Sequence, residues 1–171
     1  MFDYIDEKLH VLYRAIGVST GFEQFFVAIT ELIAAILLSY LAYRIAKKVI
    51  LRVLTVAAAK TKSNWDDILI ERKVFNKLAY LAPAYIFYWL MPYALEPYPD
   101  FIELFLLAIE VYTIIIVMLV SLAFLNSILH IYQHYEVSKS KPIKGYVQVV
   151  KILIYIVVAL TLISVMIGKS P

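Results

Sequence analysis

The chain lacks cysteine and is poor in glycine and histidine, with four glycines and three histidines in 171 residues. Without cysteine there is no disulfide framework, no thiolate metal site and no cysteine nucleophile. The few scattered glycines form no Gly-rich loop of the kind that cradles a phosphate.

The three histidines also give little indication of a metal or catalytic site. His130 and His134 are four residues apart, a spacing that can hold a metal. No third ligand is evident beside them, and we expect both at the inner membrane interface. No Ser/His/Asp pattern stands out either. The sequence therefore predicts no catalytic, cofactor-binding or metal site, and the chain does not read as an enzyme.

Charge is also scarce, at 17% of residues, whereas 63% are hydrophobic. Soluble domains are nearer 45–50% apolar, so the excess must face something other than water. The apolar runs are too long for buried strands, which rarely exceed eight residues. They also lack the alternation of a membrane barrel. These features predict an all-α integral membrane protein.

Four stretches approach the length of about 20 apolar residues that a membrane-spanning helix needs. They cover about 25–43, 78–95, 101–128 and 147–167. Pro83 and Pro92 interrupt the second stretch and should kink it. We treat 1–20 and 21–171 as two regions, an N-terminal helix and a transmembrane region.

The connections between these spans differ in charge. Nine Lys and Arg residues lie between the first two spans and four more follow the third, whereas the loop from Pro92 to Asp100 has acids and no base. Because basic loops stay in the cytoplasm, both ends of the segment are predicted on the outer side.

Two amphipathic elements are expected beside the spans. Apolar residues recur every three or four positions near the N-terminus, at Phe2, Ile5, Leu9, Leu12 and Ile16. This pattern predicts a short amphipathic helix, which either lies on the membrane surface or packs against the protein. After a turn at 61–64, residues from Trp65 onward predict an amphipathic hairpin on the cytoplasmic side.

The first long helix should extend beyond the membrane. Nothing interrupts the helical pattern from Glu23 to Lys60, a length of about 57 Å against a hydrocarbon core of about 30 Å. Its inner half carries bases on one side. The candidate contacts with lipid and membrane tension are Arg44, Lys47, Lys48, Arg52 and Trp65. The alternative is that these bases only set the topology, and both can hold.

Among the polar residues inside the predicted spans, we single out Glu31, Glu110 and Asn126. A charge at the bilayer centre costs at least about 2.5–3.5 kcal/mol, so Glu110 should be neutral or hydrogen-bonded. These residues are candidates for polar packing between helices. The alternative function for Glu110 is proton coupling. Because the basic segment lies beside a lipid leaflet, nucleic acid is a poor partner.

Two segments resemble a known family. They are residues 60–75, KTKSNWDDILIERKVF, and 141–171, KPIKGYVQVVKILIYIVVALTLISVMIGKSP. The Trp-Asp-Asp helix start, the Ile-Lys-Gly-Tyr start of the last span and the Gly-Lys-Ser-Pro after it are similar to the membrane region of the small-conductance mechanosensitive channel superfamily. The miniconductance, five-span branch is nearest, and the likeness extends loosely from about Gly21 to the end.

The resemblance implies a tension-sensing region of one channel subunit in a bacterial inner membrane, active in osmotic stress. It also implies a homo-oligomer, a heptamer if the pore region is present, with membrane lipids as partners. A Gly/Ala-rich pore helix and a cytoplasmic vestibule would follow residue 171, so the family's pore and gate residues have no matching positions here. The alternative is a self-contained four-helix membrane protein, either a proton-coupled transporter using Glu110 or a scaffold subunit.

Overall fold

The structure is a computed structural model that describes residues 2–58, 74–133, 138 and 142–168. Its elements are α1 (Phe2–Ala15), α2 (Thr20–Ala58), α4 (Val74–Leu78), α5 (Leu81–Ala94), α6 (Pro99–Gln133) and α8 (Lys144–Ile167). Every element within the described ranges is an α-helix, which confirms the all-α prediction. The predicted hairpin around Trp65 lies outside these ranges.

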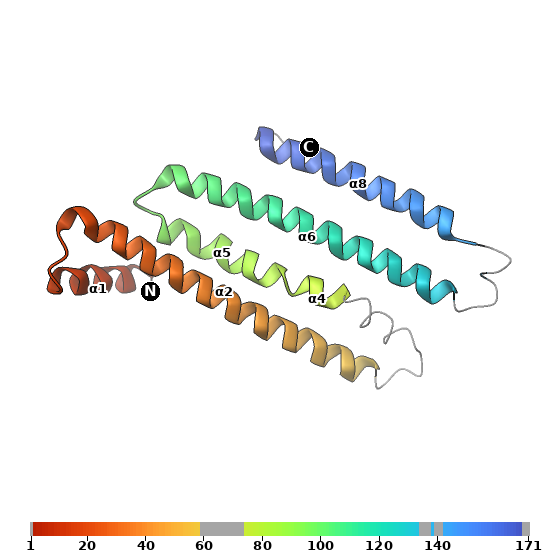
Figure 1. Cartoon of the computed structure of the whole chain (residues 1–171), viewed down its shortest axis with the longest axis horizontal. Coiled ribbons are helices and arrows are strands. Elements are labelled where there is room, and N and C mark those ends of the chain that lie inside the picture. Colours follow the sequence, from red (N-terminus) through yellow and green to blue (C-terminus); the bar gives the residue numbers. More distant parts are fainter. Residues whose placement is uncertain (1, 59–73, 134–137, 139–141, 169–171) are drawn as a thin grey trace.

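The long helices lie side by side in one layer (Figure 1). Contacts join α1 to α2, α2 to α4 and α5, these two to α6, and α6 to α8. Neighbours in the layer run antiparallel, and the N-terminal helix α1 lies beside the start of α2. Within the described ranges, a single layer leaves two broad faces with no second layer over them.

Burial in this layer is opposite to that of a water-soluble domain. Many residues at the helix contacts are small, such as Ala35, Ala79 and Ser127, each at most 1% exposed. Large apolar side chains such as Leu37 and Leu160 are about 60% exposed. Soluble proteins bury most such side chains, whereas helices in lipid pack through small residues. The pattern is that of a membrane protein.

Among the described residues, three helices are long and apolar enough to cross a membrane: Phe22–Val53, Pro99–Gln133 and Lys144–Ile167. They contain the first, third and fourth predicted spans. The first of them belongs to α2, which has 39 residues and extends well beyond the predicted 25–43, as the unbroken pattern indicated.

The second predicted span, 78–95, begins at a break between two helices, and nearly all of it lies in α5. Helix α4 ends at Leu78 and α5 begins at Leu81. Pro83 explains the break, because it has no N–H to donate and its ring clashes with the carbonyl group four residues earlier, at Ala79. At Pro92 the helix continues for two more residues. The 14 residues of α5 give about 21 Å, which is shorter than the hydrocarbon core. A fourth crossing stays a prediction.

Side-chain contacts show that the spans are staggered along the layer. The ring of Tyr43 on α2 stacks on Tyr80 with centroids 5.2 Å apart. The Tyr112 hydroxyl on α6 donates a hydrogen bond to the Tyr80 carbonyl at 3.1 Å. The next residue, Thr113, shares a hollow with Val165 of α8. The inner end of the predicted first span is therefore level with the outer end of the predicted fourth span.

Candidate functional site

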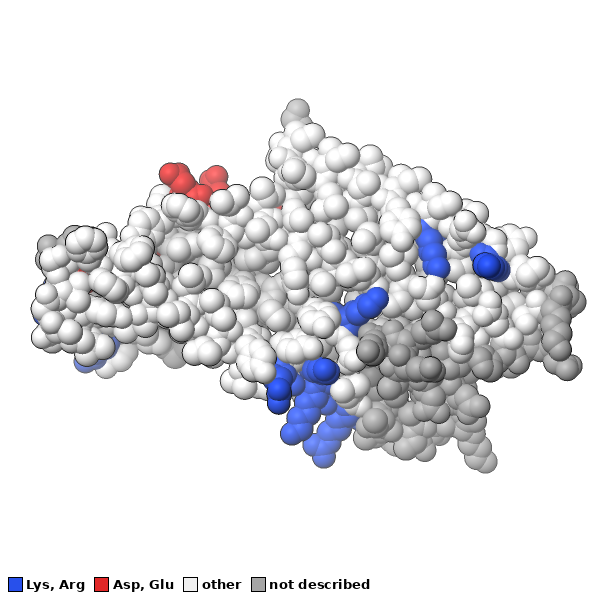
Figure 2. All heavy atoms as spheres, in the orientation of Figure 1, with Lys and Arg blue, Asp and Glu red and all other residues white. Residues whose placement is uncertain are grey.

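The basic residues of α2 lie along one exposed edge of the layer. We name Arg44, Lys47, Lys48 and Arg52 the basic edge. Lys47 is half-buried and the other three are exposed. Figure 2 shows Lys and Arg side chains gathered at this edge, at the bottom of the view, away from the acidic group on the upper edge. Trp65, the fifth candidate contact, lies outside the described residues.

Tyrosine rings support two of these bases. The guanidinium carbon of Arg44 is 5.9 Å from the centre of the Tyr40 ring, and its Nη1 donates to the Tyr40 hydroxyl at 3.3 Å. The Lys47 ammonium lies 5.8 Å from the centre of the Tyr43 ring. Cation–π contacts of this kind hold the base without neutralising its charge. The charged heads stay available to a ligand outside the protein.

Exposed bases on an apolar helix suit the phosphate groups of lipids. A base near an anionic leaflet contributes about 1 kcal/mol of attraction. Tyrosine is enriched where hydrocarbon meets water, because its ring is apolar and its hydroxyl is wet. The basic edge combines the two residue types at adjoining turns, as a membrane-interface contact requires.

A tyrosine cluster, which sequence reasoning missed, connects this edge to the rest of the layer. Lys47 lies over Tyr43, Tyr43 stacks on Tyr80, and Tyr80 accepts the hydrogen bond from Tyr112. The Tyr80 residue lies at the break between α4 and α5. Contact therefore passes from Lys47 of the basic edge through Tyr43 of α2 to the break between α4 and α5, and on to α6. The proline at 83 signals the break, but nothing in the sequence shows which tyrosines meet there.

The three polar residues predicted inside the spans lie at separate places. Asn126 joins α6 to α8, because its Oδ1 accepts a hydrogen bond from the Lys151 Nζ at 2.5 Å. Sequence reasoning placed Lys151 near the inner face and did not pair it with Asn126. Glu31 instead lines a hollow of about 270 Å³ with His10, Tyr93 and other residues.

Glu110 occupies a different setting from a residue packed between helices. It is exposed on α6 and lines a hollow of about 480 Å³ between α5, α6 and the last turns of α8. Within the described part of the chain its carboxyl group makes no hydrogen bond or ion pair. The structure thus brings none of Glu31, Glu110 and Asn126 together.

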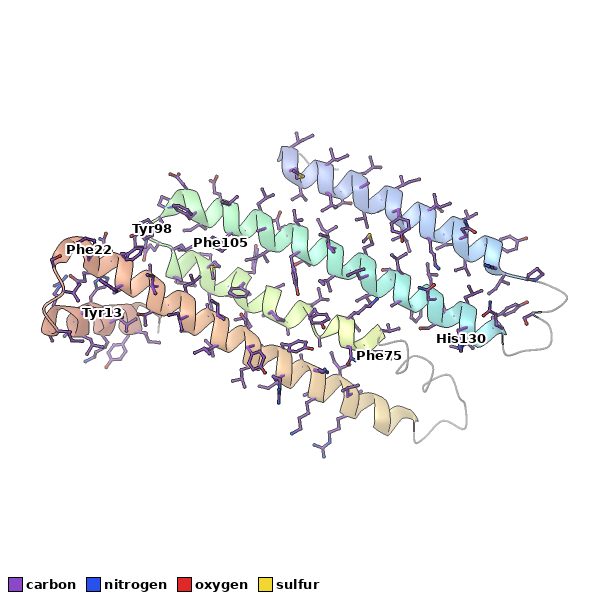
Figure 3. The ribbon with its side chains drawn as sticks, viewed as in Figure 1. Tyr13, Phe22, Phe75, Tyr98, Phe105 and His130 are labelled. Atoms are coloured by element: carbon purple, nitrogen blue, oxygen red, sulfur yellow. The ribbon has the colours of Figure 1, made fainter. Side chains whose placement is uncertain are left out.

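An ionic cluster at the start of α2, also absent from the sequence-based candidates, holds α1 in place. Glu23 is 2% exposed. Its Oε1 lies 2.7 Å from the His10 Nδ1 and accepts a hydrogen bond from the Arg14 Nε at 2.9 Å. Tyr13 points toward α2 (Figure 3), where its hydroxyl bonds that of Thr30.

This docking leaves the apolar stripe of α1 uncovered. Ile5, Leu12 and Ile16 are each at least 45% exposed, although α1 packs on α2. The sequence left two alternatives open, the membrane surface or the rest of the protein. The observed contact with α2 is made by His10, Tyr13 and Arg14, so the exposed Ile5, Leu12 and Ile16 stay available for lipid.

Metal ligands are not grouped in the described part of the chain, where no set of three His, Asp or Glu residues could hold an ion. His130 lies near the C-terminal end of α6 (Figure 3), and His134 falls outside the described residues. Compared with known proteins, the chain matches no family model and no solved structure.

Proposed function

We propose that this chain is the tension-sensing membrane region of a mechanosensitive channel subunit, which assembles as a homo-oligomer in a bacterial cytoplasmic membrane. The observation that carries the proposal is the single helical layer, with two uncovered apolar faces and a basic edge. Such a layer has most of its surface in contact with lipid, so its free energy depends on the state of the bilayer.

In this proposal the layer crosses the membrane four times. Helices α4 and α5 together run from Val74 to Ala94, about 31 Å at 1.5 Å per residue, which matches the hydrocarbon core. Both ends of the segment lie on the outer side, and the basic edge meets the inner leaflet. The acidic turn between α5 and α6, with Glu96 and Asp100, faces outward. The distribution of charges in Figure 2 supports this orientation.

The stagger of the spans requires the layer to be inclined. The centres of the first and fourth spans are displaced from each other along the helix axes by about 25 Å, at 1.5 Å per residue. Helices α2 and α8, which contain these two spans, are separated across the layer by three interhelical spacings, or about 27 Å at 8–10 Å per spacing. Helices inclined by about 40°, the upper end of the observed range, bring both apolar segments into one bilayer.

Membrane tension can act on an inclined layer by changing its inclination. Stretching thins the bilayer. A greater inclination of the helices shortens the protein layer along the membrane normal and enlarges the area that the protein occupies in the membrane plane. An equilibrium shifts only through a free-energy difference between states, and here the difference lies in that area and in the lipid contacts. The basic edge holds one side of the layer at the inner leaflet, so the inclination changes about that side. The tyrosine cluster passes the movement to α6 and α8.

Pressure-clamp recordings from the channel that contains this region test the proposal. Replacing Arg44, Lys48 and Arg52 by Gln should raise the tension needed for opening, because the inner anchor is weakened. Lys8 and Lys144 are exposed bases away from this edge, and replacing them by Gln should leave the threshold unchanged. An unaltered threshold in the triple variant would remove the proposal.

A further inference from the structure

The hollow beside Glu110 has the dimensions of a small-molecule site. Its volume of about 480 Å³ lies within the range of about 300–1,000 Å³ common for ligand pockets. Leu81, Ile114 and Val165 supply an apolar wall from three helices, and Tyr85 and Tyr88 face the hollow from α5. Glu110 is the ionisable acid of this lining.

Glu110 has no protein partner to compensate its charge among the described residues. Thr113, in the same lining, donates its own hydroxyl to the Ile109 carbonyl at 2.8 Å. A carboxyl group on the lipid-facing side of a span is costly unless something pairs with it. The lining therefore favours an occupant that carries the missing positive charge.

The two tyrosines favour the same kind of occupant. Both are more than half exposed, so their rings are open to a ligand. Tyr85 also contacts the Trp89 ring, with centroids 6.3 Å apart, which extends the aromatic wall. Aromatic rings attract organic cations through their electron-rich faces. A carboxylate beside two tyrosine rings is a chemical match for an ammonium or phosphonium group, and the apolar wall is a match for a hydrocarbon body.

We propose that this hollow binds a lipophilic organic cation from the membrane. Glu110 pairs with its charge, Tyr85 and Tyr88 contact the charged centre, and Leu81, Ile114 and Val165 contact its apolar part. The site lies apart from the basic edge, whose charge would repel such a ligand. It goes beyond tension sensing and does not depend on it.

Binding of radiolabelled tetraphenylphosphonium to the protein in lipid nanodiscs tests this site, with empty nanodiscs subtracted. We expect saturable binding that falls at least tenfold in Glu110→Gln and is retained in Glu110→Asp. Glu103 is an exposed acid on the same helix outside the hollow, so Glu103→Gln is the matched control and should bind normally. Tyr85→Ala should weaken binding as well. Absence of saturable binding, or equal binding in Glu110→Gln and the wild type, would overturn the proposal.

A second measurement uses the unaltered protein, so it does not depend on the folding of a variant. Dicyclohexylcarbodiimide adds as an intact molecule to a protonated carboxyl group in an apolar setting, with no leaving group. Mass spectrometry should find this adduct on Glu110, and tetraphenylphosphonium should slow its formation several-fold. Labelling of Glu110 at the same rate with and without the cation would contradict occupancy of the hollow.

Discussion

Asn126 and Lys151 form the polar contact observed between α6 and α8, so its removal should be measurable. Asn126→Ala deletes the acceptor at 2.5 Å and leaves the Lys151 ammonium to find another partner within the span. Hydrogen bonds between membrane helices average about 0.6 kcal/mol and reach about 1.7 kcal/mol. We expect a loss in the free energy of unfolding within this range, measured by steric trapping in bilayers. Thr161→Val is the control, because the Thr161 hydroxyl donates to the Val157 carbonyl within the same helix, and equal losses in both variants would refute the assignment.

Glu23 is the residue through which α1 is held on α2. Glu23→Gln removes the charge that faces Arg14 and His10, at 2.9 Å and 2.7 Å. Amide hydrogen exchange in α1 should then become several-fold faster, while exchange in α6 and α8 stays the same. Glu7 is exposed on the same helix, so Glu7→Gln should change nothing. Faster exchange throughout the molecule would mean that Glu23 supports the whole fold rather than this one contact.

At the residue scale the sequence indicated which polar side chains matter but not their partners. Asn126 was a candidate for helix packing because an amide inside a span needs a partner. Its partner Lys151 could not be identified, because the sequence gives depth along each helix and not the register between helices. Glu23 was missed for the same reason, since its partners lie on a helix that folds back only in three dimensions.

At the level of elements, the tyrosine cluster stabilises the break between α4 and α5. Tyr112→Phe removes the hydroxyl that donates to the Tyr80 carbonyl at 3.1 Å. A hydrogen bond of this kind contributes about 1 kcal/mol, so unfolding by sodium dodecyl sulfate should become easier by that amount. Tyr155 is exposed on α8, and Tyr155→Phe is the matched control. If the two variants are equally stable, the break is held by other contacts.

The elements themselves were largely predictable. Long apolar runs specify three of the helices, because a lipid-facing helix is apolar on all sides and needs no particular partner. The second span was expected to be kinked at Pro83 and Pro92, whereas the structure breaks the helix at the start of the span, between Leu78 and Leu81, and continues it through Pro92. Proline chemistry predicts a disturbance at Pro83, but whether the chain bends or breaks depends on what fills the gap. Here the Tyr43 ring stacks on Tyr80 and the Tyr112 hydroxyl donates to the Tyr80 carbonyl.

At the scale of the whole molecule the sequence predicted helices and not their arrangement. Amphipathic helices in water show which face is buried, but α6 carries apolar residues on nearly every side, as at Ile114, Ile115 and Ile116. Nothing in such a pattern distinguishes a layer from a bundle. The stagger of the spans was equally hidden, because it depends on contacts among Tyr43, Tyr80 and Tyr112.

The inclination of the layer is the claim on which tension sensing depends, and polarised infrared spectroscopy of oriented bilayers measures it in the unaltered protein. The long helices should be inclined by about 40° to the membrane normal, rather than by the average of about 20°. The angle should increase further as lipids with shorter acyl chains thin the bilayer. Helices near 20° whose angle does not respond to bilayer thickness would contradict the account.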